Sequence, residues 1–169
     1  MRVSREQALA NRERIVECAA RLFREHGFEG VGVDAVMREA GLTHGGFYGH
    51  FAGKEELIAL ACQRAVGDFL VHWRPKGYAA LLESYLSVGH VRHPGRGCLL
   101  AALGCELVRQ SARVQEAVRP ALEEMVVFLG EGDRNVGICR CATLVGALVL
   151  ARTLDESVLE AVRSSLRDR

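Results

Sequence analysis

The sixteen residues Gly41-Leu-Thr-His-Gly-Gly-Phe-Tyr-Gly-His-Phe-Ala-Gly-Lys-Glu-Glu56 decide how the first third of the chain folds. They are typical of the turn and second helix of a helix-turn-helix, followed by the start of another helix. Gly41 can end one short helix, and Thr43 can cap the next. Phe47 and Phe51 form an apolar stripe because they are four residues apart. The stretch has no acidic residue before its last two, so its surface can meet a strongly negative partner such as nucleic-acid phosphate.

Helical periodicity continues along the whole chain, and no segment alternates as a strand does. We therefore predict an all-α fold with about nine helices. Pro75, the run from His93 to Gly97 and the run from Gly130 to Asp133 mark breaks between some of them. The predicted helices span residues 4–26, 33–40, 44–50, 53–74, 76–88, 97–110, 112–130, 135–152 and 155–167.

Composition alone favours no nucleic-acid partner, because the net charge is +1 and residues 1–60 hold eight Lys or Arg against nine Asp or Glu. The amino terminus is charged at once, unlike a signal peptide. The longest apolar run, Cys141 to Ala151, is shorter than the roughly 20 residues that a membrane helix needs. We expect a cytoplasmic protein with no membrane partner. No CxxC pair occurs, so we expect no metal site, and nothing indicates a cofactor.

The first third of the chain resembles the TetR-type transcriptional repressors in many elements that occur in family order and spacing. These elements are Arg14-Ile15, Ala19, Leu22-Phe23, Gly27-Phe28, Asp34, Val36, Ala40-Gly41, Gly46, Phe47-Tyr48, His50-Phe51, Lys54-Glu55 and Leu57. The resemblance implies a three-helix DNA-binding head over residues 1–52 and a helical effector-binding and dimerisation domain over residues 53–169. It implies a repressor, not an enzyme, that a small ligand or a reactive electrophile releases from a palindromic operator in double-stranded DNA.

The resemblance also assigns DNA contacts. Lys54 looks like the phosphate contact at the start of a long helix, where the helix dipole favours an anion. Tyr48 and His50 resemble the family's outward pair, and Thr43 combines a cap with a possible contact. The segment departs from the family pattern in Gly45, Gly46 and Gly49, which carry no side chain, and Gly32 replaces the usual Thr or Ser. The expected DNA-binding residues are Thr43, His44, Gly45, Gly46, Tyr48, His50 and Lys54.

Two of the six cysteines are candidate effector sensors. Cys98 follows Arg96 at a helix start, a position that favours thiolate. Gly97-Cys98-Leu99 also resembles a family branch that includes electrophile and oxidant sensors. Cys105 lies seven residues later, close to two helical turns, so the sequence places it on the same face. The alternative interpretation is that both cysteines are small apolar residues of a helical core.

The last two helices are expected to form a homodimer through residues 135–167, as the resemblance implies. Leu144, Leu148 and Ala151 form a face rich in small apolar residues, which we interpret as the interface. Residues 76–130 are expected to enclose an effector pocket lined by Leu, Val, Ala and Cys with few polar groups.

Two other classes of protein remain open from the sequence. An all-α thiol-redox enzyme would also be helical and rich in cysteine, although it would leave the Gly41–Glu56 pattern unexplained. A helical interaction module that has lost DNA binding would fit the recognition helix that is poor in side chains. A DNA shift assay separates a DNA-binding protein from both.

Overall fold

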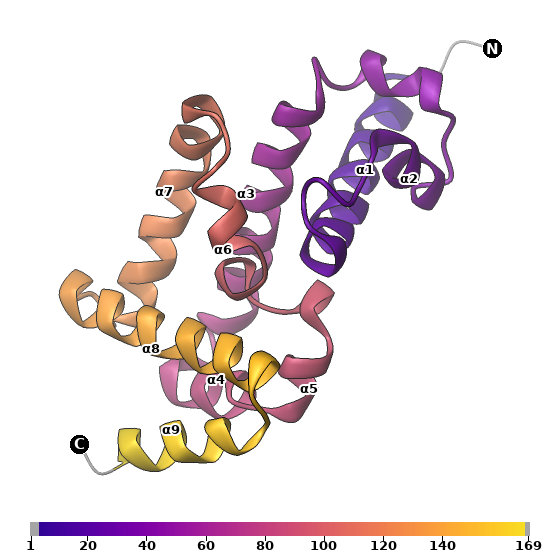
Figure 1. Ribbon diagram of the computed structural model, residues 1–169. Helices are drawn as coiled ribbons and strands as arrows, with labels where there is room; N and C mark the ends of the chain where they lie inside the picture. The colour runs from indigo at the N-terminus through magenta and orange to yellow at the C-terminus, as the bar shows by residue number, and fades with distance from the viewer. Residues whose placement is uncertain (1–3, 168–169) are drawn as a thin grey trace.

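The computed structural model describes residues 4–167 as an assembly of helices, and no strand occurs in that range (Figure 1). Nine α-helices and two short 3-10 helices follow one another, in agreement with the all-α fold that the sequence predicts. In chain order they are α1 (Arg5–His26), α2 (Val33–Glu39), the 3-10 helix η1 (His44–Gly49), α3 (Lys54–Trp73), α4 (Gly77–Tyr85), α5 (Val88–Arg92), the 3-10 helix η2 (Pro94–Arg96), α6 (Leu99–Leu107), α7 (Ala112–Leu129), α8 (Arg134–Thr153) and α9 (Ser157–Arg167).

The head consists of α1, α2 and η1 around one apolar centre. The Ser4 hydroxyl begins α1 by accepting a hydrogen bond from the Gln7 amide. Burial of aromatic and aliphatic side chains then holds the three elements together. The fully buried side chains of the head include Ile15, Phe23, Phe28, Val36, Met37 and Phe47.

The turn of the helix-turn-helix is built as the sequence predicts. Gly41 has a φ of 70°, a left-handed conformation that glycine adopts without strain. This lets the Leu42 amide donate a hydrogen bond back to the Met37 carbonyl at 2.8 Å, which ends α2. The recognition segment after the turn is a 3-10 helix, and its three glycines give a physical reason because glycine lowers α-helix propensity.

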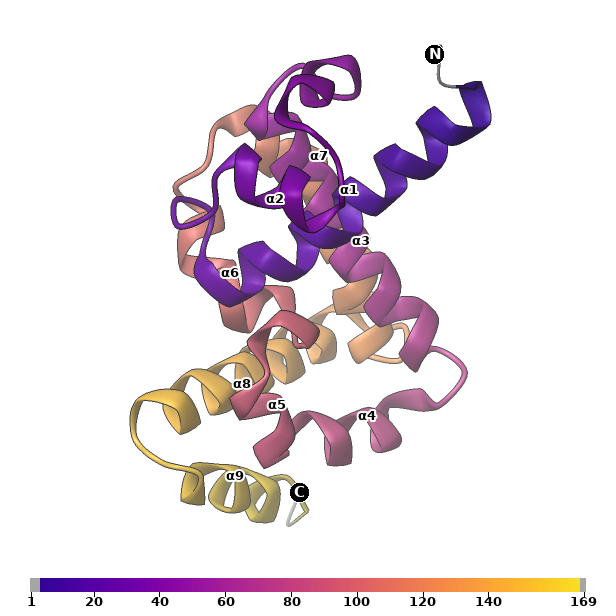
Figure 2. The ribbon, with the colours of Figure 1, turned by 90° about the vertical axis from the view of Figure 1, so that its right-hand side faces the viewer.

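Helix α3 connects the head to the rest of the molecule. It packs against α1 on one side and against α7 on the other, and its amino end lies beside η1 while its carboxyl end reaches α4 (Figures 1 and 2). Its buried face is apolar along its length, from Leu57 through Ala61 and Val66 to Leu70.

One predicted helix is divided in two in the structure. The helix expected over residues 76–88 ends at Tyr85, because Leu86 leaves the helical region with ψ of 55° and the Ser87 side chain caps a new helix, α5. In addition, Pro120 lies inside α7 and does not end it. Pro120 is exposed, so its ring meets no packed neighbouring helix.

Helix α8 corrects the predicted interface face. Leu144, Leu148 and Ala151 are buried inside the chain itself, with Leu148 at 0% exposure. The apolar residues left in solvent lie on other faces of the helix and include Val136, Ile138, Val149 and Leu150. The prediction that Leu144, Leu148 and Ala151 form an intermolecular surface was therefore wrong, because the chain already covers them.

The same helix is also the one segment, among the described residues, that is long and apolar enough to span a membrane. This criterion is weak because the core helix of a water-soluble protein meets it too. The helix is longer than the run from Cys141 to Ala151 on which the sequence argument relied.

Candidate nucleic-acid interface and internal cavity

The 3-10 helix η1 presents one buried and several exposed side chains. Phe47 is fully buried and stacks on Phe51 with ring centroids 5.3 Å apart, so the segment is anchored to the head. Tyr48 is 69% exposed, and its ring meets the Phe47 ring edge-on at 5.2 Å between centroids. Thr43 occupies the cap position and is exposed, but its side chain makes no capping hydrogen bond. Its hydroxyl is therefore available to an external partner.

The glycines of η1 are not required by the fold. A Cβ atom added to Gly45 or Gly49 would meet nothing within 4 Å, and one added to Gly46 would only touch the end of the Met37 side chain at 3.7 Å. None of the three has a positive φ. The packing of the protein does not require glycine at these positions. The exposed backbone of η1 therefore leaves room for the close approach of an external partner.

His44 is exposed, and its Nδ1 atom contacts the Asp34 carboxylate of α2. The sequence analysis treated the stretch as free of acidic groups, but this carboxylate comes from an adjacent helix. The contact depends on the angle between α2 and η1, so no local sequence pattern indicates it. The His44 side chain is thus exposed, but it is already in contact with a carboxylate.

A set of polar contacts stabilises the connection between η1 and α3. The Arg12 guanidinium donates to the His50 carbonyl at 3.4 Å and pairs with Glu56 at 3.1 Å, and Glu56 also accepts from the Ala52 amide at 2.7 Å. Arg12 lies over the Phe51 ring as well. These contacts fix the orientation of Lys54, the first residue of α3. Arg12 and Glu56 have a structural role that the sequence analysis missed.

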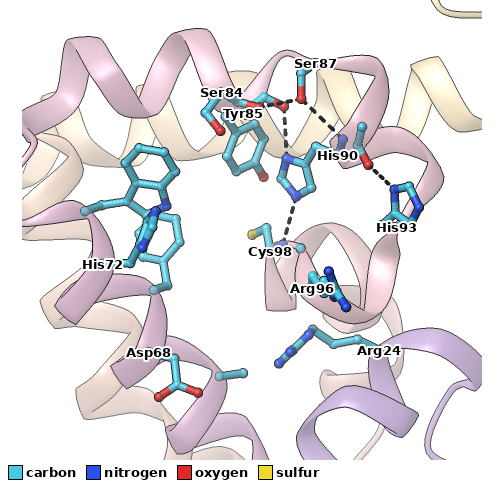
Figure 3. A pocket seen from close by; sticks show the side chains of 15 residues that line it. Arg24, Asp68, His72, Ser84, Tyr85, Ser87, His90, His93, Arg96 and Cys98 are labelled. Carbon is cyan, nitrogen blue, oxygen red and sulfur yellow. Dashed lines mark hydrogen bonds between the residues drawn. The ribbon is translucent and has the colours of Figure 1, made fainter.

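A separate cavity of about 560 Å³ lies between the carboxyl end of α1, the second half of α3, and the segment from α4 to Cys98 (Figure 3). Its volume is in the usual range for small-molecule sites. Phe69, Trp73 and Tyr85 supply aromatic walls. The remaining lining is largely polar and includes Arg24 and Arg96. The prediction of a pocket within residues 76–130 lined by Leu, Val, Ala and Cys was therefore right in part: nine of the fifteen lining residues lie in that range, but α1 and α3 supply the others and no Leu or Val is among them.

The floor of the cavity is organised by His90. Its Nδ1 atom lies 2.9 Å from the Tyr85 carbonyl, and its Nε2 atom accepts the Cys98 amide at 3.0 Å (Figure 3). The ring must therefore be neutral, with the proton on Nδ1. Burial lowers the pKa of His90, and the Arg152 guanidinium lowers it further, although the bond to Tyr85 opposes this shift.

The structure separates the two candidate sensor cysteines. Cys98 lines the cavity and is 6% exposed, whereas Cys105 is exposed and does not line the cavity. Burial raises the pKa of Cys62 to about 12 and that of Cys141 to about 11, so these thiols are poor nucleophiles. Cys139 is exposed while Cys141 is buried. In the described part of the chain, no group of three or more His, Cys, Asp or Glu side chains could hold a metal ion.

The head matches a known family. Residues 15–61 match the family model of bacterial regulatory proteins, tetR family. The chain is also 36% identical over 70 residues to an HTH-type transcriptional regulator of Staphylococcus aureus, a match that covers 41% of this chain and 38% of that protein. The matched part is thus well under two thirds of the relative.

Solved structures extend the similarity to the full fold. A TetR transcriptional regulator from Chloroflexus aurantiacus superposes with a TM-score of 0.76 at 25% identity, covering 95% of this chain and 94% of the other. The reduced form of Escherichia coli NemR superposes with a TM-score of 0.77 at 18% identity, covering 94% and 96%. The second likeness concerns the fold alone.

Head, connecting helix and helical body together have the architecture of helix-turn-helix regulators of the TetR class. The amino-terminal domain of this chain belongs to the tetR family of bacterial regulatory proteins, and the whole chain has the fold of solved TetR-family regulators.

Proposed function

We propose that the chain is a cytoplasmic DNA-binding transcriptional regulator that represses its target as a homodimer on a palindromic operator. The observation that carries the proposal is the exposed surface of η1, which has three glycines that the fold does not require. The family match over residues 15–61 supports it. We assign the protein no enzymatic activity.

The proposed DNA contacts are Thr43, His44, Tyr48, His50, Lys54 and the backbone at Gly45 and Gly46. Lys54 stands at the amino end of α3, where unpaired amides and the helix dipole favour phosphate. Tyr48 is exposed on η1. Because Asp34 contacts His44, base discrimination by His44 depends on the orientation that this carboxylate imposes.

A shift assay with the DNA upstream of the gene tests this function. Affinity should fall steeply with salt, since phosphate contacts release counterions. Lys54→Ala should weaken operator and random DNA by similar factors and reduce the salt slope by about one. Lys76→Ala is the matched control because Lys76 lies beyond the opposite end of α3, over the Trp73 ring. Salt-insensitive binding, or parent-like affinity in Lys54→Ala, would contradict the proposal.

For the dimer, we propose an interface through residues 135–167 that uses the exposed apolar side chains of α8 in place of Leu144, Leu148 and Ala151. Ile138 and Val149 are 42% and 43% exposed and lie on one side of the helix. Apolar side chains grouped on an exposed helix face are typical of association surfaces.

For effector release, we propose that Cys98 is the sensing residue. Its thiol lies in the cavity under α3, so modification adds bulk against the helix that carries the head. Release of operator by N-ethylmaleimide should be lost in Cys98→Ser and should persist when Cys18, Cys62, Cys139 and Cys141 are replaced. The same assay on Cys105→Ser tests whether that exposed thiol contributes. Parent-like release of Cys98→Ser would leave a non-covalent ligand as the effector.

A further inference from the structure

The cavity has an excess of cationic groups. Among its lining residues are two arginines, Arg24 and Arg96, against one carboxylate, Asp68, while the His90 ring is neutral. That carboxylate already accepts two hydrogen bonds from the Arg64 Nε atom, at 2.8 and 2.9 Å. The protein therefore leaves the positive charge of the cavity largely uncompensated.

Arg24 is the centre of this imbalance. Its Nε and Nη2 atoms donate to the Gly95 carbonyl at 3.0 and 2.6 Å, while Nη1 is shielded from solvent and has no hydrogen-bond partner. No ion pair within 4 Å joins Arg24 to a carboxylate among the described residues. Burial lowers the pKa of Arg24, although the Asp68 and Glu25 carboxylates oppose this shift. A partly buried guanidinium with an unfilled donor is unfavourable, so an anion beside it would be stabilised.

The opposite wall supplies an apolar surface. Phe69 and Trp73 line the cavity from α3, and the Tyr85 ring lines it from α4 (Figure 3). The Tyr85 hydroxyl is buried beside the Cys98 thiol and has no nitrogen or oxygen partner. Flat aromatic walls next to a cationic corner fit a molecule with a planar apolar body and one negative end.

We propose that this cavity binds a small organic carboxylate with a flat apolar body. Its carboxylate lies against the Arg24 and Arg96 guanidinium groups, and its body lies between Phe69, Trp73 and Tyr85. Calling this ligand the effector rests on the proposed function, but its chemical class rests on the cavity alone.

Trp73, the one tryptophan of the sequence, lines the cavity and reports on its occupancy. Trans-cinnamate and benzoate should change its fluorescence in a saturable way, with a stoichiometry of one per chain by calorimetry. Cinnamamide and benzamide have the same shapes without the charge and should bind about tenfold more weakly or worse, since charge-assisted hydrogen bonds are about twice as strong as neutral ones. Equal affinity for acid and amide, or no saturable binding of either acid, would overturn the proposal.

Substitution then locates the cation responsible. Arg24→Gln should abolish the preference for acid over amide, whereas Arg109→Gln, an exposed arginine outside the cavity, should keep it. Circular dichroism reports whether Arg24→Gln folds. If this variant does not fold, the comparison of acid and amide binding to the parent protein tests the proposal by itself. A folded Arg24→Gln that retains the parent preference contradicts the proposal.

The titration contains no DNA, so its outcome is independent of operator binding. A parent protein that binds cinnamate but shifts no operator would sink the proposed function and support the ligand site. A parent protein that shifts its operator and binds neither acid would support the proposed function and contradict the ligand site.

Discussion

Gly45 is a residue whose identity the protein itself does not require, because a Cβ atom there would meet nothing within 4 Å. Replacing it by alanine should leave the fold intact and stabilise it by up to about 1 kcal/mol, since glycine is the poorer helix former. The added methyl group should nevertheless weaken operator binding if DNA approaches the bare backbone. Thermal unfolding and a shift assay measure the two effects.

Gly67→Ala on α3 is the matched control, because Gly67 is equally free of neighbours but lies away from η1. It should give a similar gain in stability with unchanged affinity for DNA. If Gly45→Ala binds the operator as the parent does, the glycines of η1 serve no close contact.

His90 makes the stability of the protein depend on pH. Its pKa is lowered in the folded state, mainly by burial, from an ordinary value of 6.5. As pH falls through 6.5, His90 takes up a proton in the unfolded chain but stays neutral in the folded chain. The free energy of unfolding therefore decreases. One such proton contributes at most about 1.4 kcal/mol per pH unit.

His90→Gln should therefore reduce the loss of stability between about pH 7.5 and about pH 5.5, because glutamine can still donate and accept at this position but does not titrate there. Urea unfolding of parent and variant at several pH values measures the difference. His26→Gln, an exposed histidine, should leave the pH dependence nearly as in the parent. A His90→Gln curve parallel to the parent would contradict the argument.

At the level of elements, α8 shows what a helical pattern does and does not specify. Its length and position follow from the sequence, because Asp133 caps it and apolar residues recur along it. Its orientation does not follow, since apolar side chains occur on more than one face and periodicity cannot tell which face the chain buries. The division between α4 and α5 was also hidden, because Leu86 breaks the helix through its backbone conformation and not through its residue type.

This orientation gives opposite expectations for two adjacent residues. Val149→Glu places a charge on the exposed stripe and should yield folded monomers. Leu148→Glu places a charge in the core of the chain, which costs several kcal/mol or more and should prevent folding. Sedimentation gives the mass, and circular dichroism gives the helicity. Val71→Glu, 78% exposed on α3, should change neither. A dimeric Val149→Glu would refute the revised interface.

At the level of the whole molecule, the head was predictable and the cavity was not. The head is nearly continuous in sequence, so caps, turn glycines and the spacing of Phe47 and Phe51 indicate it locally. The cavity joins Arg24 to side chains between Ala65 and Cys98. The packing of α1 against α3 and against η2 brings them together, and no local pattern encodes those contacts.

Glu106 makes a further long-range contact, which joins α6 to the segment after α1. Its carboxylate accepts the Phe28 amide at 2.7 Å, and a Cβ atom at Gly27 would collide with it. Hydrogen bonds to charged groups contribute about 1.5–3 kcal/mol, so Glu106→Ala should lower the free energy of unfolding by about that amount.

Hydrogen exchange at the Phe28 amide should also accelerate in this variant. Glu116→Ala, an exposed carboxylate on α7, is the control and should change neither quantity appreciably. Unchanged exchange at Phe28 would mean that the contact contributes nothing in solution.

The Phe28–Glu106 and Arg24–Gly95 contacts also limit how such proteins can be recombined. A chimera made by exchanging residues 1–52 alone would separate two donors from acceptors that lie some seventy to eighty positions later in the chain. A donor head with a different residue at position 24 or 27 would meet a body shaped for arginine and glycine. A chimera designed to keep the DNA specificity proposed for this protein should therefore exchange the segment from Gly95 to Glu106 together with the head.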